Sequence, residues 1–126
     1  CHPLLSLDTI KRAVEKVLST GYNSYTSVVP TTDWIFSEDG EPITNTQSSM
    51  LSTAHSRKFY KVAHAFHVFT KAYFLRHYQV WSLTHNDPSL IEIPEGESYD
   101  VNTQMEFEIA KAAYVRAQQD RLSAEF

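Results

Sequence analysis

The 126-residue chain has little of several features that define common protein classes. Its single cysteine, Cys1, excludes an internal disulfide and a cysteine-rich zinc site. Its formal net charge of -4 argues against a nucleic-acid-binding protein, because such proteins are usually basic. No apolar run approaches the ~20 residues of a membrane span, and no signal peptide is recognisable. We therefore expect a cytoplasmic protein that binds neither nucleic acid nor membrane.

Glycine is also scarce, and the three glycines are isolated, so the sequence contains no glycine-rich phosphate-binding loop. It also lacks a nucleophile elbow and a His-Glu-x-x-His motif. On spacing alone, the sequence contains no complete catalytic site. The chain begins at Cys1 without a methionine, and apolar residues follow at once. We expect that it is cut from a longer protein or that another segment precedes it.

Aromatic residues, in contrast, are plentiful, with seven Phe, seven Tyr and two Trp. This composition and length predict one folded domain over residues 1–126. Capping residues, apolar periodicity and turn signals predict the following order: a helix from Ser6 to Gly21, a strand over 24–29 ending at Pro30, a hairpin around Asp39-Gly40, a loop over 44–53, a strand over 59–69, a helix from Lys71 to about Val80, a strand over 90–93, and a closing helix after Thr103. That alternation predicts a three-layer α/β sheet with an inserted hairpin.

The closing helix carries the clearest start signal. Thr103 and Glu106 have the spacing of a capping box. An apolar face follows, formed by Phe107, Ile109, Ala110, Ala113, Tyr114 and Ala117. We expect this face to pack against the rest of the domain.

Asp100 and Asn102 stand just before that helix. Residues two apart on an extended strand project to the same side. Two oxygen ligands on one side suit Mg²⁺, which takes one or two carboxylates together with substrate phosphates. The alternative is a strand-to-helix turn in which both side chains satisfy backbone groups. On spacing alone, the strand-to-helix turn is the favoured interpretation.

A basic cluster stands out in this acidic chain. Arg57, Lys58 and Lys61 lie close together in the sequence, with His55 and His64 beside them. The cluster could receive a phosphate or a sugar carboxylate. It could equally be a solvated sheet edge, where lysine discourages further strand pairing.

His64 and His67 are candidate metal ligands by residue type. His64 and His67 are three residues apart in an expected strand, so they should face opposite sides and should not share a metal ion. A structural role, in the core or on the surface, is the simpler interpretation of both.

Three segments in order resemble the acylneuraminate cytidylyltransferase (CMP-sialic acid synthetase) family. They are Pro3-Leu4-Leu5-Ser6 with Thr9-Ile10, then Tyr25-Thr26-Ser27-Val28-Val29 followed by Trp34, Asp39-Gly40 and Pro42-Ile43, and finally the stretch from Ile93 to Phe107. The resemblance spans nearly the whole chain but covers only the later part of such an enzyme. The earlier part, which carries the CTP-binding loop, has no counterpart here.

The resemblance implies a partial Rossmann-like nucleotidyltransferase sheet with an inserted β-hairpin that mediates homodimerisation. It implies transfer of CMP from CTP to a sialic-acid-like sugar, with release of pyrophosphate and help from Mg²⁺ at Asp100 and Asn102. Arg57, Lys61, His64 and His67 are the implied substrate-binding residues. Because the CTP-binding part is absent, we expect this chain alone to be inactive.

The sequence departs from the family pattern in two places. The family's Asp-x-Asp is Asp100-Val101-Asn102 here, which loses one charge. In the sugar-binding stretch, Ser52-Thr53-Ala54 replaces Arg-Thr-Gln, and residues 63–67 read Ala-His-Ala-Phe-His in place of Asn-Gly-Ala-Phe-Tyr. Three interpretations follow: an enzyme part in which Arg57 or Lys61 replaces the missing arginine, a non-catalytic relative that dimerises or binds a ligand, and an unrelated small α/β domain.

Overall fold

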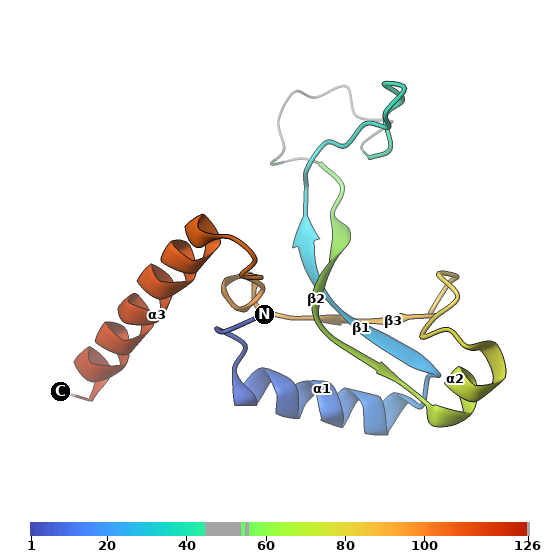
Figure 1. The fold of residues 1–126 in the computed structure, drawn as a ribbon, viewed down its shortest axis with the longest axis horizontal. Helices are drawn as coiled ribbons and strands as arrows, with labels where there is room; N and C mark the ends of the chain where they lie inside the picture. Colours follow the sequence, from blue (N-terminus) through green and yellow to red (C-terminus); the bar gives the residue numbers. More distant parts are fainter. Residues whose placement is uncertain (45–53, 55, 126) are drawn as a thin grey trace.

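The computed structural model describes residues 1–44, 54 and 56–125. Its elements are α1 (Leu7–Thr20), β1 (Ser24–Thr31), β2 (Phe59–Phe69), α2 (Lys71–His77), β3 (Ser89–Glu92), the short 3-10 helix η2 (Glu95–Glu97) and α3 (Gln104–Ala124) (Figure 1). The fold is a mixed α/β arrangement, which confirms the expected class. The polar stretch over 45–53 and His55 lie outside the described residues.

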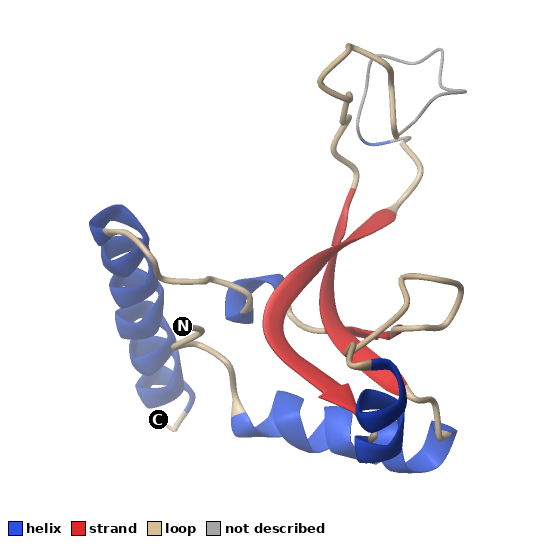
Figure 2. Ribbon diagram, turned by 45° about the vertical axis from the view of Figure 1, so that its right-hand side comes forward, coloured by secondary structure: helices blue, strands red, loops and turns tan. Residues whose placement is uncertain are grey.

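The three strands form one mixed sheet in the order β2-β1-β3 (Figure 2). β1 pairs antiparallel with β2 along its full length. It pairs parallel with β3 over a shorter stretch that ends at Val28. Pro30 lies beyond that stretch, so its missing N–H breaks no bond to β3. This is why β1 continues to Thr31 and does not end at Pro30 as the sequence predicted.

The helix α1 forms as predicted and packs against one face of the sheet (Figure 1). The Ser6 hydroxyl caps its start by accepting from the Thr9 N–H at 3.1 Å. Gly21, with φ 68°, takes the left-handed conformation that ends it. The core between helix and sheet is formed by Ala13 of α1, Tyr25 of β1 and Ile91 of β3.

The chain leaves the sheet between β1 and β2, and the described part of this excursion contains the expected hairpin. Phe36 and Pro42 form an isolated antiparallel bridge. Ile43 donates its N–H to the Ile35 carbonyl at 2.8 Å. Gly40, with φ 83°, makes the tight turn that the Asp-Gly signal predicted. Figure 1 shows the excursion projecting beyond the end of the β1–β2 pair.

The two later helices differ from expectation. α2 starts at its Thr70 cap but ends at His77, because Tyr78 adopts a left-handed conformation with φ 51°. α3 begins with the predicted capping box. It then runs away from the sheet (Figure 1). Among its described residues, Ala110 is buried, whereas Phe107 and Tyr114 stay exposed, so the expected packing of its apolar face is wrong for most of its length.

Within the described part of the chain, none of the helices combines the length and apolar character that crossing a membrane requires.

Candidate functional site

A bulge of several residues interrupts the pairing of β1 and β2. His67 pairs with Thr26 and Val62 pairs with Val28, so residues 63–66 of β2 lie opposite Ser27 alone. At this point His64 takes a left-handed backbone conformation with φ 56°. Bulges of this kind change the direction in which side chains project from a strand.

Ser27 holds the bulge in place. Its hydroxyl oxygen accepts hydrogen bonds from the N–H groups of Ala65 at 3.0 Å and Phe66 at 3.2 Å. The same hydroxyl donates to the Phe66 carbonyl at 3.3 Å. Ser27 is fully buried. A single side chain therefore replaces the strand-to-strand bonds that the bulge removes.

The bulge brings His64 and His67 together. His64 Nδ1 lies 3.4 Å from His67 Nε2. The two rings meet edge to face, with centroids 5.4 Å apart. The expectation that these side chains face opposite sides is wrong, because it assumed regular alternation along β2. The register shift and the positive φ of His64 break that alternation.

His67 is fixed on its other sides as well. Its Nδ1 lies 2.8 Å from the Thr26 hydroxyl, and its ring packs edge-on against Trp81 at 4.8 Å. Burial lowers the pKa of His67, and the neighbouring His64 lowers it further. Since Tyr25 faces α1, the alternation of β1 places Thr26, and the histidine pair with it, on the opposite face of the sheet.

Asp100 and Asn102 also come together, as their spacing predicted. The Asn102 amide donates to Asp100 Oδ2 at 2.8 Å. The Cys1 amine contacts Asp100 Oδ1 at 2.5 Å. The bond from the Cys1 amine and the bond from Asn102 lower the pKa of the Asp100 carboxyl. In this arrangement the two side chains bond to each other, and Asn102 presents N–H groups where Mg²⁺ needs oxygen.

The turn into α3 is held by the capping box. Glu106 Oε2 accepts from the N–H of Asn102 at 2.8 Å and of Thr103 at 2.7 Å. The described residues contain no group of three or more His, Cys, Asp or Glu able to hold a metal ion. As placed, Asp100 and Asn102 bond to each other at the turn into α3, and the Mg²⁺ site stays a prediction.

Part of the basic cluster lies in one pocket. Lys58 and Lys61 line a cavity of about 330 Å³ at the base of the excursion, together with Pro30, Thr31, Thr32, Asp33 and Glu95. Arg57 lies next to this region with its guanidinium 5.7 Å from the centre of the Phe59 ring. Lys61 pairs with Val29, which alternates to the α1 face, so it lies apart from the histidine pair. The four implied substrate residues therefore do not form one site.

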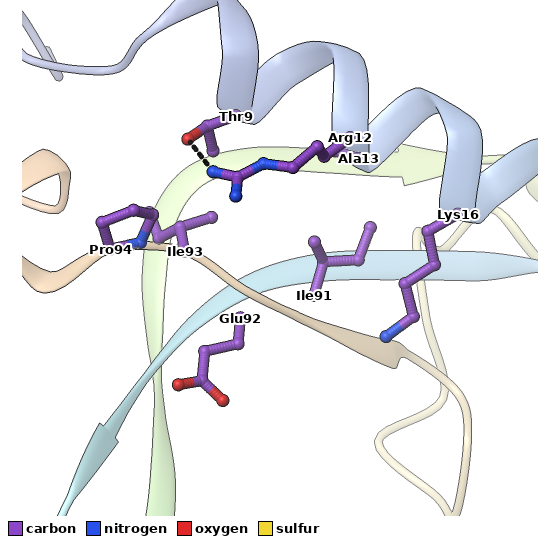
Figure 3. Close-up of a pocket in the computed structure, with 8 residues that line it drawn as sticks. All are labelled: Thr9, Arg12, Ala13, Lys16, Ile91, Glu92, Ile93 and Pro94. Atoms are coloured by element: carbon purple, nitrogen blue, oxygen red, sulfur yellow. Dashed lines mark hydrogen bonds between the residues drawn. The ribbon is translucent and has the colours of Figure 1, made fainter.

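A second groove lies between α1 and the outer edge of β3 (Figure 3). It encloses about 500 Å³. Arg12 and Lys16 reach over it from α1, and Glu92 points away from it. The Lys16 ammonium donates to the Leu90 carbonyl at 2.7 Å, and Arg12 donates to the Thr9 hydroxyl at 3.2 Å. Both cations thus have partners, and Lys16 covers part of the exposed strand edge.

Asp87 ties the segment after α2 to β1. Its carboxylate accepts from the hydroxyls of Ser24, Tyr73 at 2.8 Å and Ser82 at 2.7 Å. The bond from Ser24 contributes most to the lowered pKa of Asp87. This network places the loop that carries Trp81 over the histidine pair.

Glu97 makes a similar connection at the start of α1. It accepts from the Ser6 N–H at 3.3 Å. Burial would raise the pKa of Glu97, but hydrogen bonds from Thr9 and Ser6 and the charge of Arg12 outweigh it and lower the pKa. The negative charge lies at the helix N-terminus, where it is favourable.

Sequence reasoning missed three of these features. The i, i+4 spacing of Arg12 and Lys16 could have indicated a shared helix face. Ser27 and Asp87 gave no local signal, because their partners lie far along the chain.

No protein-family model matches this chain, and no curated protein matches it either.

Proposed function

We propose that this chain is the sugar-acid-binding later part of a Rossmann-like nucleotidyltransferase of the CMP-sugar-acid synthetase type. The observation that carries the proposal is the pocket at the base of the excursion, which Lys58 and Lys61 line together with Thr31 and Thr32. Ammonium and hydroxyl groups together suit a sugar that bears a carboxylate. Asp33 and Glu95 line the same pocket and can accept from sugar hydroxyls.

In the proposed reaction, the anomeric hydroxyl of the sugar acid attacks the α-phosphate of CTP, and pyrophosphate leaves. Lys58 and Lys61 bind and orient the sugar carboxylate, which reduces the entropic cost of bringing the two substrates together. The nucleotide has to be held by a CTP-binding part of the enzyme that this sequence does not contain.

The backbone at the bulge supports the resemblance. The family stretch Asn-Gly-Ala-Phe-Tyr corresponds to residues 63–67, so the family glycine falls on His64. His64 has φ 56°, a conformation that glycine adopts without cost and other residues adopt rarely. At His64, the backbone has the conformation that the glycine of the family motif would favour.

The resemblance also implies Mg²⁺, for which Asp100 is the candidate ligand. In the described geometry Asp100 Oδ2 accepts from the Asn102 amide at 2.8 Å. We therefore derive no step through the ion, and include it in the assay as an expected requirement of the complete enzyme.

A binding titration tests the pocket. N-acetylneuraminic acid should bind the chain, and Lys61→Ala should weaken binding by about tenfold or more, since one charge-assisted hydrogen bond contributes roughly 1.5–3 kcal/mol. Arg57→Ala should weaken it less. Lys11→Ala, which removes the same charge from the exposed surface of α1, is the matched control. Equal affinities for Lys61→Ala and Lys11→Ala would contradict the assignment.

An activity assay tests the proposed class. The chain incubated with CTP, Mg²⁺ and a panel of sugar acids should release no pyrophosphate. Supplying a CTP-binding part in the same assay should produce turnover. Turnover by the chain alone would refute the requirement for that part.

We further propose that the excursion mediates homodimerisation. Ile35, Phe36 and Ile43 are exposed around the hairpin, at 44%, 59% and 60%. A second copy of the same chain would cover this apolar area. Sedimentation at increasing concentration should show a dimer, and Phe36→Ser should shift it toward monomer. A monomer at every concentration would contradict the proposal.

A non-catalytic relative that binds a ligand or dimerises is the second candidate. The contact between Asn102 and Asp100 favours it, because this pair is satisfied without a metal. Sugar-acid binding without turnover, even after the CTP-binding part is added, would select this function.

A further inference from the structure

We propose that His64 Nδ1 and His67 Nε2 form a binding site for a divalent transition metal ion of the zinc class. Two imidazole nitrogens, each about 2.0–2.1 Å from a tetrahedral ion, are about 3.3–3.4 Å apart. The two nitrogens in the structure are 3.4 Å apart. The separation therefore matches that of two nitrogens bound to one tetrahedral ion.

The hydrogen bond to Thr26 orients the first ligand. The Thr26 hydroxyl lies 2.8 Å from His67 Nδ1 and can accept a hydrogen bond from its N–H. That tautomer leaves the lone pair on Nε2, the nitrogen that faces His64. Metal-bound histidines commonly donate their second ring N–H in this way. Thr26 is fully buried, so the partner is fixed.

The backbone positions the second ligand. A regular strand would place His64 and His67 on opposite faces. The bulge opposite Ser27 and the positive φ of His64 bring the rings onto one side. Ser27 holds this backbone through bonds to Ala65 and Phe66. The arrangement therefore exists without the ion, which lowers the cost of binding it.

The site is open. Both histidines are exposed, so an ion can enter from solvent. Among the described residues, no further His, Cys, Asp or Glu joins them to make a set of three. Water or an added ligand would fill the remaining positions, as at zinc sites that keep an exchangeable position.

A direct hydrogen bond between the rings is the competing interpretation. Typical N–H hydrogen bonds have donor–acceptor distances of about 2.7–3.2 Å, and 3.4 Å lies outside that range. The contact is therefore at most a long hydrogen bond, and an ion bound by both nitrogens would replace it.

The experiment uses the emission of Trp81, whose ring lies 4.8 Å from that of His67. The background carries Trp34→Phe, which leaves Trp81 as the single tryptophan, and Cys1→Ser, because a free thiol binds the same ions. Co²⁺ is titrated into the 126-residue chain, with quenching of Trp81 and the visible absorption of Co²⁺ as readouts. Zn²⁺ is then added to displace it.

The key variant is His64→Gly. Glycine suits the positive φ at this position, so the bulge should persist while one ligand is lost. Removing one of two tethered ligands should weaken Co²⁺ binding on the order of 10²-fold. His85→Ala, which removes an exposed histidine from the loop before β3, is the matched control and should bind as the background does. Circular dichroism checks that each variant is folded.

Saturable quenching that Zn²⁺ reverses, lost in His64→Gly and kept in His85→Ala, would support the site. Three results would overturn it: no Co²⁺ binding at millimolar concentration, equal affinity in His64→Gly and the background, or binding that leaves Trp81 emission unchanged.

Discussion

Replacing Ser27 tests the structural role assigned to the bulge. In Ser27→Ala, the N–H groups of Ala65 and Phe66 lose their acceptor in a partly buried region. A buried donor without a partner costs about 1–3 kcal/mol. Two such donors would cost about 2–6 kcal/mol together. Because His64 is exposed and water can reach that side of the bulge, we expect the free energy of unfolding to fall by roughly 2–4 kcal/mol.

Urea denaturation measures this loss as a shift of the midpoint at constant slope. Hydrogen exchange of the Ala65 and Phe66 amides measures it locally, and both should exchange faster. Ser19→Ala is the control, because its exposed hydroxyl bonds only within α1, and the change should stay within about 0.5 kcal/mol.

If Ser27→Ala is too unstable to study, Ser27→Cys keeps the size of the side chain with a weaker acceptor. It should lose less stability than Ser27→Ala and show intermediate exchange. A loss below about 0.5 kcal/mol for Ser27→Ala, with unchanged amide protection, would refute the reasoning.

Three further predictions concern stability. The lowered pKa of Glu97 means that the folded state binds fewer protons than the unfolded state. The free energy of unfolding should exceed that of Glu97→Gln by about 1 kcal/mol at pH values above the usual glutamate pKa of about 4.3. This difference should vanish as the pH falls through the lowered pKa of Glu97, and a difference that persists in acid would contradict the prediction. Asp87→Ala removes the acceptor of three hydroxyls and should cost about 1–2 kcal/mol after allowance for partial exposure, and unchanged urea midpoints would argue against that network. His64→Gly should raise the free energy of unfolding by about 1 kcal/mol, because it relieves a left-handed non-glycine residue, and a decrease would count against the assigned backbone conformation.

The helix starts could be predicted because their signals are local. Ser6 and Thr103 each bond within their own first turn, so the sequence window that shows the signal also contains the partner. The Asp-Gly turn is predictable for the same reason. The end of α2 was predicted three residues too late, since the left-handed conformation of Tyr78 is not one that its residue type favours.

The arrangement of the candidate sites depends on contacts that no local window contains. The alternation of β2 fails because Ser27, on another strand, stabilises the bulge. Asp100 and Asn102 could be placed together from their spacing. The backbone between them is held from far along the chain, because the Val101 N–H donates to the Cys1 carbonyl at 2.8 Å. The position of α3 could not be predicted either. Its amphipathic spacing identifies an apolar face but does not say which surface covers that face.

The central position of β1 also determines when the sheet can form. Tyr25 pairs with Ser89 and Thr26 pairs with Leu90, far along the chain. The chain between β1 and β3 must come together before these contacts can stabilise the sheet. Folds rich in such distant contacts fold slowly. During synthesis, β1 can pair with β2, but its other edge stays unpaired until β3 has been made. A chain of this topology is most exposed to aggregation in that interval.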